Sequence, residues 1–133
     1  MSLKSDLERF KAKTEAKMNK AVRMISLQSF SECIMMSPVD TGRFRGNWQT
    51  KVGAAPAGIV EVLDPSGQIA TAKVQGAVAG MEVGDVIYMS NNLPYAGRLE
   101  DGSSTQAPGG MVKLTVQRWQ PIANKIIAEV GAE

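Results

Sequence analysis

The stretch SPVDTGRFRGNWQ, residues 37–49, decides the fold, because it separates a long helical pattern from everything that follows. Asp40 and Thr41 can cap local backbone amides, and Gly42 can adopt a positive φ. Together these residues predict a tight corner that leads from a helix into a strand.

Beyond the corner, we expect an extended chain from Gly42 onward. In that conformation Arg43 and Arg45 point to one face, and Phe44 and Trp48 to the other. The two arginines would then be presented together, either to a phosphate backbone or to carboxylates of a neighbouring strand or subunit. Their spacing alone favours ion pairing over contact with DNA.

Upstream of the corner, the sequence predicts a long amphipathic helix over residues 5–36. Its apolar residues fall mostly at spacings of three, four or seven: Leu7, Phe10, Met18, Ala21, Val22, Ile25, Phe30 and Ile34. Ser5 and Glu8 fit a capping box at its start, and Ser37 before Pro38 ends it. A helix of this length must pack along a sheet or project to meet a partner.

Downstream, residues 43–99 have the character of a sheet region. The segments NWQTKV and IVEVLD, joined by GAAPAG, predict a pair of antiparallel strands, and GDVIYMSNN predicts a further strand. Between them, residues 67–80 fit either a short helix or an irregular strand. A glycine-rich loop at 101–110, which we expect to be mobile, then leads to a C-terminal helix at 111–130.

This order of elements predicts a single domain over residues 1–133 with α+β architecture. The long N-terminal helix and the C-terminal helix should pack on one face of an antiparallel β-sheet. Pro121 lies inside the last helical pattern and predicts a kink or a break near Gln120.

Composition excludes several kinds of site. The chain has one cysteine, Cys33, and no histidine, so an internal disulfide, a histidine triad and a histidine-ligated zinc are ruled out. Gly46 is not followed by the lysine and serine or threonine of a phosphate loop. Glu100 and Asp101 are the one tempting acid–base pair, and they are also carboxylates that the arginines could meet; adjacent side chains, however, usually point apart. We therefore expect no enzyme and no cofactor.

Charge is uneven along the chain. Residues 1–51 hold ten Lys/Arg against five Asp/Glu, a balance of +5, whereas residues 52–133 hold five against eight, a balance of −3. Such asymmetry is typical of a solvated helix face, of contact with an acidic neighbour, or of contact with nucleic acid. No apolar run has the roughly 20 residues of a membrane helix, and the N-terminus lacks a signal-peptide core, so we expect no membrane partner.

Two stretches together resemble a known family. The corner PVDTGR follows a long first helix, and NNLPYAGRLEDGSSTQAPGGMV, residues 91–112, leads into a final helix. In this order and spacing they resemble the tail-completion and head–tail connector proteins of long-tailed bacteriophages, often described as minor tail or neck proteins. The resemblance covers nearly the whole chain, and the two motifs carry most of it.

The resemblance implies a structural subunit of a phage or prophage virion that forms a ring, commonly of six copies, at the head–tail junction or tail end. Partners would be further copies and other neck or tail proteins, with DNA at most in the ring lumen, and no catalysis is implied. The protein would be found in the virion, and in the host cytoplasm during assembly. Family positions carried over to this sequence are the corner, the core anchor and the second motif: Asp40, Thr41, Gly42 and Arg43, then Trp48, then Tyr95, Glu100 and Gly102.

The alternative is a small nucleic-acid-binding protein that uses the basic first helix with Arg43 and Arg45. A net charge of +2 and an aromatic content of 5% count against it, because such binders concentrate positive charge and add stacking side chains.

Overall fold

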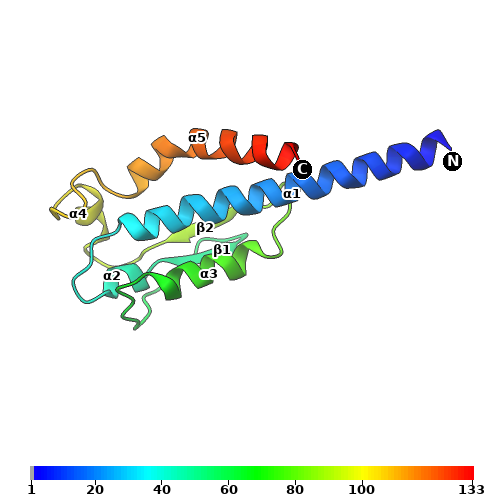
Figure 1. Ribbon diagram of the computed structural model, residues 1–133. Helices are drawn as coiled ribbons and strands as arrows, with labels where there is room; N and C mark the ends of the chain where they lie inside the picture. Colours follow the sequence, from blue (N-terminus) through cyan, green and yellow to red (C-terminus); the bar gives the residue numbers. More distant parts are fainter. Residues whose placement is uncertain (1) are drawn as a thin grey trace.

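The computed structural model describes residues 2–133, and its α+β architecture confirms the predicted fold class (Figure 1). A long N-terminal helix and a C-terminal helix pack with a small antiparallel sheet. The elements are, in order, α1 Leu3–Met36, α2 Arg43–Gly46, β1 Gln49–Val52, α3 Gln68–Val78, β2 Ile87–Ser90, α4 Ala96–Glu100 and α5 Val112–Gly131.

Helix α1 begins at a different cap from the one that the sequence suggested. The side-chain oxygen of Ser2 accepts a hydrogen bond from the backbone N–H of Ser5, 3.2 Å away, so Ser2 is the N-cap and Ser5 already lies inside the helix. The predicted capping box of Ser5 and Glu8 is therefore wrong. At the other end, Ser37 is extended, as a residue before proline must be, and α1 ends at Met36.

The sheet has two strands, and its pairing differs from the prediction. β1 pairs with β2, with Gln49 opposite Ser90 and Val52 opposite Ile87. Residues 59–64 form no strand, so the predicted pairing of NWQTKV with IVEVLD is wrong. The side chain of Asn47 explains the difference: it accepts from the N–H of Val60 at 3.0 Å and donates to the Val60 carbonyl at 3.1 Å. A buried amide thus replaces the ladder partner that a strand would supply.

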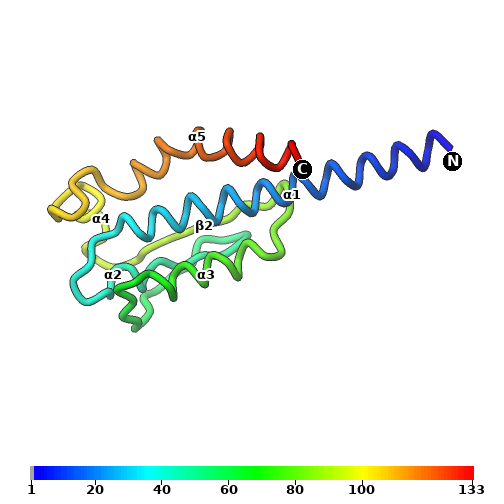
Figure 2. The backbone as a smooth tube through the Cα atoms, viewed as in Figure 1, coloured from blue at the N-terminus to red at the C-terminus, as the bar shows by residue number. Residues whose placement is uncertain are grey.

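The helices surround α1. Helix α5 runs antiparallel along one side of α1, while α3 follows another side and covers β1 (Figures 1 and 2). One buried cluster joins Ala21 and Ile25 of α1 to Ile122, Ile126 and Val130 of α5. Helix α5 continues through Pro121 without interruption, so of the two predicted alternatives, a kink or a break near Gln120, the break does not occur.

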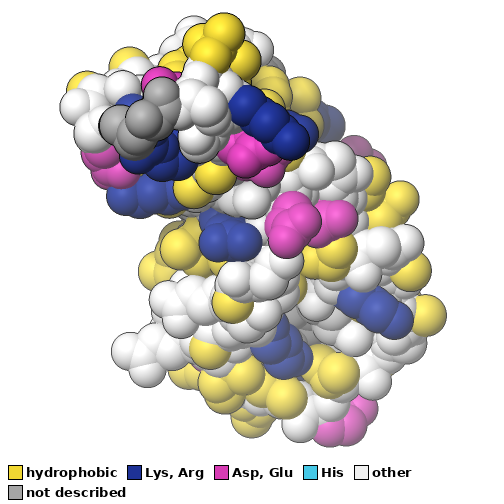
Figure 3. Space-filling view, turned by 90° about the vertical axis from the view of Figure 1, so that its right-hand side faces the viewer, with side chains coloured by type: hydrophobic (Ala, Val, Ile, Leu, Met, Phe, Trp, Pro, Cys, Tyr) yellow, Lys and Arg dark blue, Asp and Glu magenta, His cyan; other side chains and the backbone are white. Residues whose placement is uncertain are grey.

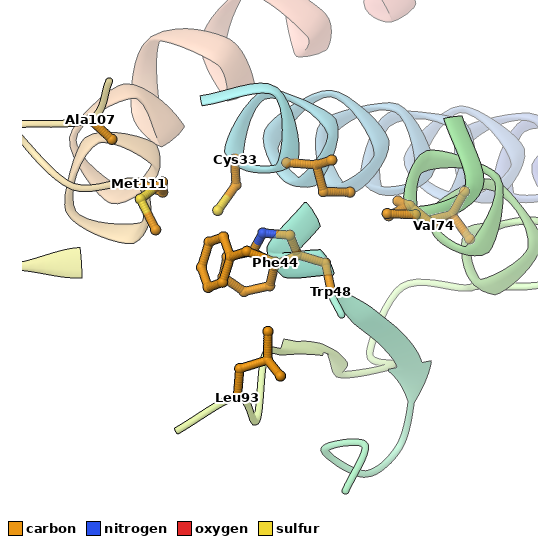
Figure 4. Packing of buried hydrophobic residues seen from close by; sticks show 10 residues of the cluster. Cys33, Phe44, Trp48, Val74, Leu93, Ala107 and Met111 are labelled. Carbon is orange, nitrogen blue, oxygen red and sulfur yellow. The ribbon is translucent and has the colours of Figure 1, made fainter. Parts of the chain in front are cut away.

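The larger cluster lies where α1 meets the corner. Trp48, 5% exposed, packs edge-on against Phe44 with ring centroids 5.7 Å apart. Figure 4 shows these rings close to Cys33 and Leu93. The indole N–H of Trp48 donates to the Ser37 hydroxyl at 2.8 Å, and that hydroxyl donates to the Cys33 carbonyl at 2.9 Å. The corner is thereby fastened to the last turn of α1.

Gly42 is the position at which the corner tolerates no side chain. Its φ is +89°, and a Cβ built there would collide with the backbone of Asp64 and Pro65. A backbone hydrogen bond also joins the two segments, since the N–H of Asp64 donates to the Gly42 carbonyl at 2.9 Å. Glycine is therefore required at position 42 both for the positive φ of the turn and for the close approach of residues 64–65.

We predict that Gly42→Ala destabilises the fold far more than Gly53→Ala. Gly53 has a similar φ of +94° but nothing within 4 Å of its would-be Cβ, so its substitution costs only backbone strain, about 1–2 kcal/mol. At Gly42 the collision should add about 1–3 kcal/mol. Urea unfolding followed by circular dichroism measures both variants, and equal losses would show that the close approach to Pro65 is unimportant.

Candidate assembly surfaces

The corner residues do not adopt the extended conformation that the sequence suggested. Residues Arg43–Gly46 form the short helix α2, closed by the N–H of Gly46 donating to the Gly42 carbonyl at 3.0 Å. Gly46 packs tightly on Val62, where a Cβ would lie 2.6 Å from the carbonyl oxygen. The prediction that Arg43 and Arg45 point together to one face rests on extended backbone and is wrong.

The side chain of Arg45 binds the end of α1. Its guanidinium donates to the carbonyls of Ser37 at 3.1 Å, Pro65 at 2.8 Å and Met35 at 2.8 Å. The last carbonyls of a helix have no intrahelical partner, so a cation that binds them stabilises the helix end. Arg45 is therefore a structural residue of this corner and not one of a pair of arginines offered to a phosphate.

The two stretches that carry the family resemblance lie against each other. The side chain of Gln106 accepts from the N–H of Val39 and donates to its carbonyl, each at 2.9 Å. The rings of Phe44 and Tyr95 lie 6.2 Å apart. Between them is a shallow pocket of about 250 Å³. Its lining includes Asp40, Thr41, Gly42, Arg43, Tyr95 and Ser104.

Glu100 belongs to a different part of the same region, the start of α5. Its carboxylate accepts from the backbone N–H groups of Met111 at 3.0 Å, Val112 at 2.8 Å and Lys113 at 3.0 Å. Partial burial opposes ionisation, but these three hydrogen bonds and the Lys113 charge outweigh it and lower the pKa of Glu100. Glu100 is thus an anionic cap of α5.

Within residues 2–133, neither acidic residue of the second motif pairs with Arg43 or Arg45, so the expected ion pairing is absent inside one chain. Asp101 lies 3.8 Å from the Lys113 ammonium. The capping role of Glu100 could not be predicted from local sequence patterns, because the amides that its carboxylate binds lie 11, 12 and 13 residues further along the chain.

The loop 101–110 makes defined contacts in this structure. Gly102 has a φ of +91°, and a side chain there would collide with the Pro108 carbonyl. Ala107 is buried, and its N–H donates to the Ser104 carbonyl at 3.2 Å. No observation tests how this loop moves, so its mobility in the free subunit stays a prediction.

The first turns of α1 extend beyond the rest of the molecule (Figure 1). We call residues 3–16 the arm. Helix α5 ends beside the base of the arm, where the Lys17 ammonium donates to the Gly131 carbonyl at 3.2 Å and Lys20 pairs with Glu133 at 2.7 Å. Nothing in the described chain covers α1 beyond that point, so the arm is exposed on nearly every side.

The arm carries an apolar stripe. Leu3, Leu7 and Phe10 are 73%, 57% and 70% exposed, and their spacing of four and three residues places them on one side of the helix. Figure 3, which looks along the arm toward the body, shows Lys, Arg and acidic side chains around it as well. Leu7 and Phe10 belong to the amphipathic pattern predicted for this helix, and the structure leaves that part of the pattern uncovered.

A groove of about 430 Å³ lies between α1, the start of α5 and β2. Its lining is mostly apolar and includes Phe30, Cys33, Ile87, Met89, Val116 and Trp119. We call it the α1/α5 groove. Val116 and Trp119, which lie on its α5 wall, are 68% and 49% exposed. Burial raises the pKa of the Cys33 thiol to about 11, so the thiol stays neutral and weakly nucleophilic.

Two searches of the described chain bear on other kinds of site. Residues 2–133 contain no group of three or more cysteine or acidic side chains placed to hold a metal ion. Among the same residues, no helix combines the length and apolar character needed to cross a bilayer. Besides the arm, the α1/α5 groove and the pocket beside the corner, the described residues line further hollows, among them a mostly apolar one of about 370 Å³ that includes Met18, Val83 and Ile127.

We predict that Glu100→Gln weakens the start of α5 and changes the acid limb of stability. A carboxylate with a lowered folded pKa stabilises the fold above the ordinary value of 4.5, and this contribution is lost as the pH falls through the folded pKa. Replacing it with an amide should cost about 0.5–2 kcal/mol at pH 7. The variant should also lose less of its stability than the wild type as the pH falls below 4.5 and through the folded pKa of Glu100.

The control is Glu129→Gln, which removes an exposed carboxylate paired with Lys125 within α5. Such pairs contribute about 0.3–0.5 kcal/mol, so this variant should follow the wild-type curve. Urea unfolding at a series of pH values measures all three proteins. If the Glu100 and Glu129 variants show the same free energy of unfolding at each pH, Glu100 contributes no more to stability than an exposed surface carboxylate.

Comparison with known proteins adds no relative. No family model, curated protein or solved structure matches this chain. The resemblance to phage tail-completion proteins therefore stays a prediction, and a function has to be argued from the chain's own surfaces.

Proposed function

We propose that this chain is a structural virion protein of a tailed phage or prophage, whose copies associate into a ring at the head–tail junction or tail end. The exposed stripe of Leu3, Leu7 and Phe10 on the arm carries this proposal. Fully burying one such side chain stabilises by about 1.5–3 kcal/mol. Three such side chains are exposed to water on one rigid helix, so a partner that covers them would stabilise the assembly.

The positions of the surfaces support a ring. A heterologous interface needs two different patches on one subunit, so that each copy meets the next with the other patch. The arm lies at one end of the molecule, and the corner with the second motif lies at the other (Figure 1). The resemblance supplies the place of such a ring, in the neck or tail, together with its partners: further copies and other neck or tail proteins. The protein would then be found in the virion, and in the host cytoplasm during assembly.

Glu100 argues against an enzyme. A catalytic acid at neutral pH needs a raised pKa, whereas the pKa of Glu100 is lowered and its oxygens are occupied by three amides. Nucleic-acid binding is less well supported than a structural role, because the guanidinium of Arg45 binds backbone carbonyls and is not offered to a phosphate. The basic residues of the arm are interspersed with Asp6, Glu8 and Glu15.

We predict that the wild-type protein forms a discrete oligomer and that Phe10→Glu weakens it. A carboxylate in the stripe would have to be desolvated on assembly, so the midpoint concentration should rise at least tenfold, about 1.4 kcal/mol. Ala12→Glu is the matched control, since residue 12 lies on the opposite side of the arm, about 180° from the stripe at 100° per residue. Light scattering coupled to size-exclusion chromatography measures the mass over a wide concentration range at two salt levels.

A wild-type protein that stays monomeric at every concentration and both salt levels would contradict self-association. Equal weakening by the two glutamates would show that charge on the arm matters and the stripe does not. The nucleic-acid alternative has its own signature, which is DNA binding that falls steeply with added salt.

A further inference from the structure

We propose that the α1/α5 groove of one subunit receives the arm of the next subunit. The inference rests on the proposed function, because it names the two surfaces that meet when copies associate. The occupant is residues 3–16 of a second copy, with Leu3, Leu7 and Phe10 turned into the groove. The surfaces that meet are therefore different patches, as a ring requires.

The arm cannot fill the groove of its own chain. The groove runs beside Ser26, Ser29, Phe30 and Cys33, which belong to the same helix as the arm. Helix α1 is continuous over Leu3–Met36, with no glycine or proline at which it could fold back. Only a second chain can bring Phe10 into contact with Trp119.

The two surfaces match in length and chemistry. Leu3 and Phe10 are seven residues apart, and so are Ser26 and Cys33 on the groove floor and Val112 and Trp119 on its wall. At the rise of an α-helix each of these spans is about 10 Å. The wall residues are exposed, as the stripe is: Val112 is 45%, Val116 68% and Trp119 49% exposed. An arm in the groove would remove both sets from water together. Pairing of arm with arm would cover the stripe but leave the groove open.

The buried area indicates that each subunit both gives an arm and receives one. The arm is about 21 Å long and about 10 Å wide, so covering half of it buries roughly 350 Å². A stable pair of proteins buries about 800 Å² on each partner. One arm in one groove is therefore too small a contact on its own, whereas a subunit that both gives an arm and receives one buries about 700 Å². Two copies that exchange arms place both contacts in one interface, and a closed ring divides them between two neighbours. A double-cysteine variant separates these two assemblies, because reciprocal exchange gives no species larger than a dimer.

Cross-linking between two engineered cysteines tests the proposal. In a Cys33→Ala background, Phe10→Cys and Val116→Cys are made separately and together, and mild oxidation is applied at a concentration where light scattering shows the oligomer. A disulfide requires Cα atoms within about 7 Å. We expect the mixture of the two single variants to give dimers, and the double variant to give a ladder of higher species.

The controls separate the outcomes. Ala12→Cys mixed with Val116→Cys should cross-link at least fivefold less, because residue 12 lies on the far side of the arm. Efficient cross-linking of Phe10→Cys with itself would overturn the proposal in favour of paired arms. An intact oligomer with no cross-link in the mixture would overturn it as well, while leaving the proposed function standing. A monomeric protein before oxidation would instead contradict the proposed function.

A second measurement needs no cysteine variant. Trp48 is buried and Trp119 is half-exposed at the groove wall, so filling the groove should shift the emission of Trp119 to shorter wavelength as the concentration rises. Trp119→Phe should abolish the shift, and Phe10→Glu should move it to higher concentration. An oligomer that forms with no change in tryptophan emission would show that the groove stays open to water.

Discussion

The structure depends on how the carboxyl end of α1 is satisfied. A helix leaves its last carbonyls without partners, and here they are met by the residues that turn the chain. The Ser37 hydroxyl donates to Cys33 and accepts from the Trp48 indole, and Arg45 donates to Met35 and Ser37. These bonds fix where α2 and β1 begin relative to α1. Each element after the corner is placed from that end of the helix.

A second constraint is the difference in length between the two main helices. Helix α1 has 34 residues and α5 has 20, and the two run antiparallel from the corner end of α1. Helix α5 therefore ends beside Lys17 and Lys20, and the apolar stripe of α1 continues past the last residue that could cover it. The same pairing leaves the groove at the other end, where the start of α5 is spaced from β2. The mismatch in length thus leaves the stripe uncovered, while the groove follows from the spacing of α5 from β2.

Much of the fold could be predicted from local patterns in the sequence. The end of α1 before Pro38 and the strand character of residues 87–90 follow from the restricted conformation before proline and from β propensity. The partner of β1 could not be predicted, because it depends on Asn47 holding Val60 by its side chain, a contact between residues without a shared pattern. Helical periodicity placed Ala21, Ile25 and Ile34 among the apolar positions of α1, and these three are buried. It could not show that the arm lies beyond the reach of α5, since that depends on how two distant helices are aligned.

The glycine and aspartate of the corner predicted the turn at Gly42 correctly, but the expectation that two arginines would be presented together was wrong. Gly42 has the positive φ that the pattern predicted, but the residues after it form a turn of helix and separate Arg43 from Arg45. A short helix and an extended strand are not distinguished by four residues of sequence. What distinguishes them here is the return of residues 62–65 past Gly42 and Gly46, a tertiary contact.

The continuity of α1 has a geometric consequence for any assembly built from it. Stripe and groove floor lie on one rigid helix, so the angle between them about its axis is fixed by the number of residues that separate them, at about 100° for each. In a repeating assembly this angle would help set the rotation from one subunit to the next, and hence the number of copies that close. Adding or removing a single residue of the arm between Phe10 and Lys17 would leave both surfaces chemically intact. It would nevertheless change the symmetry that they can generate.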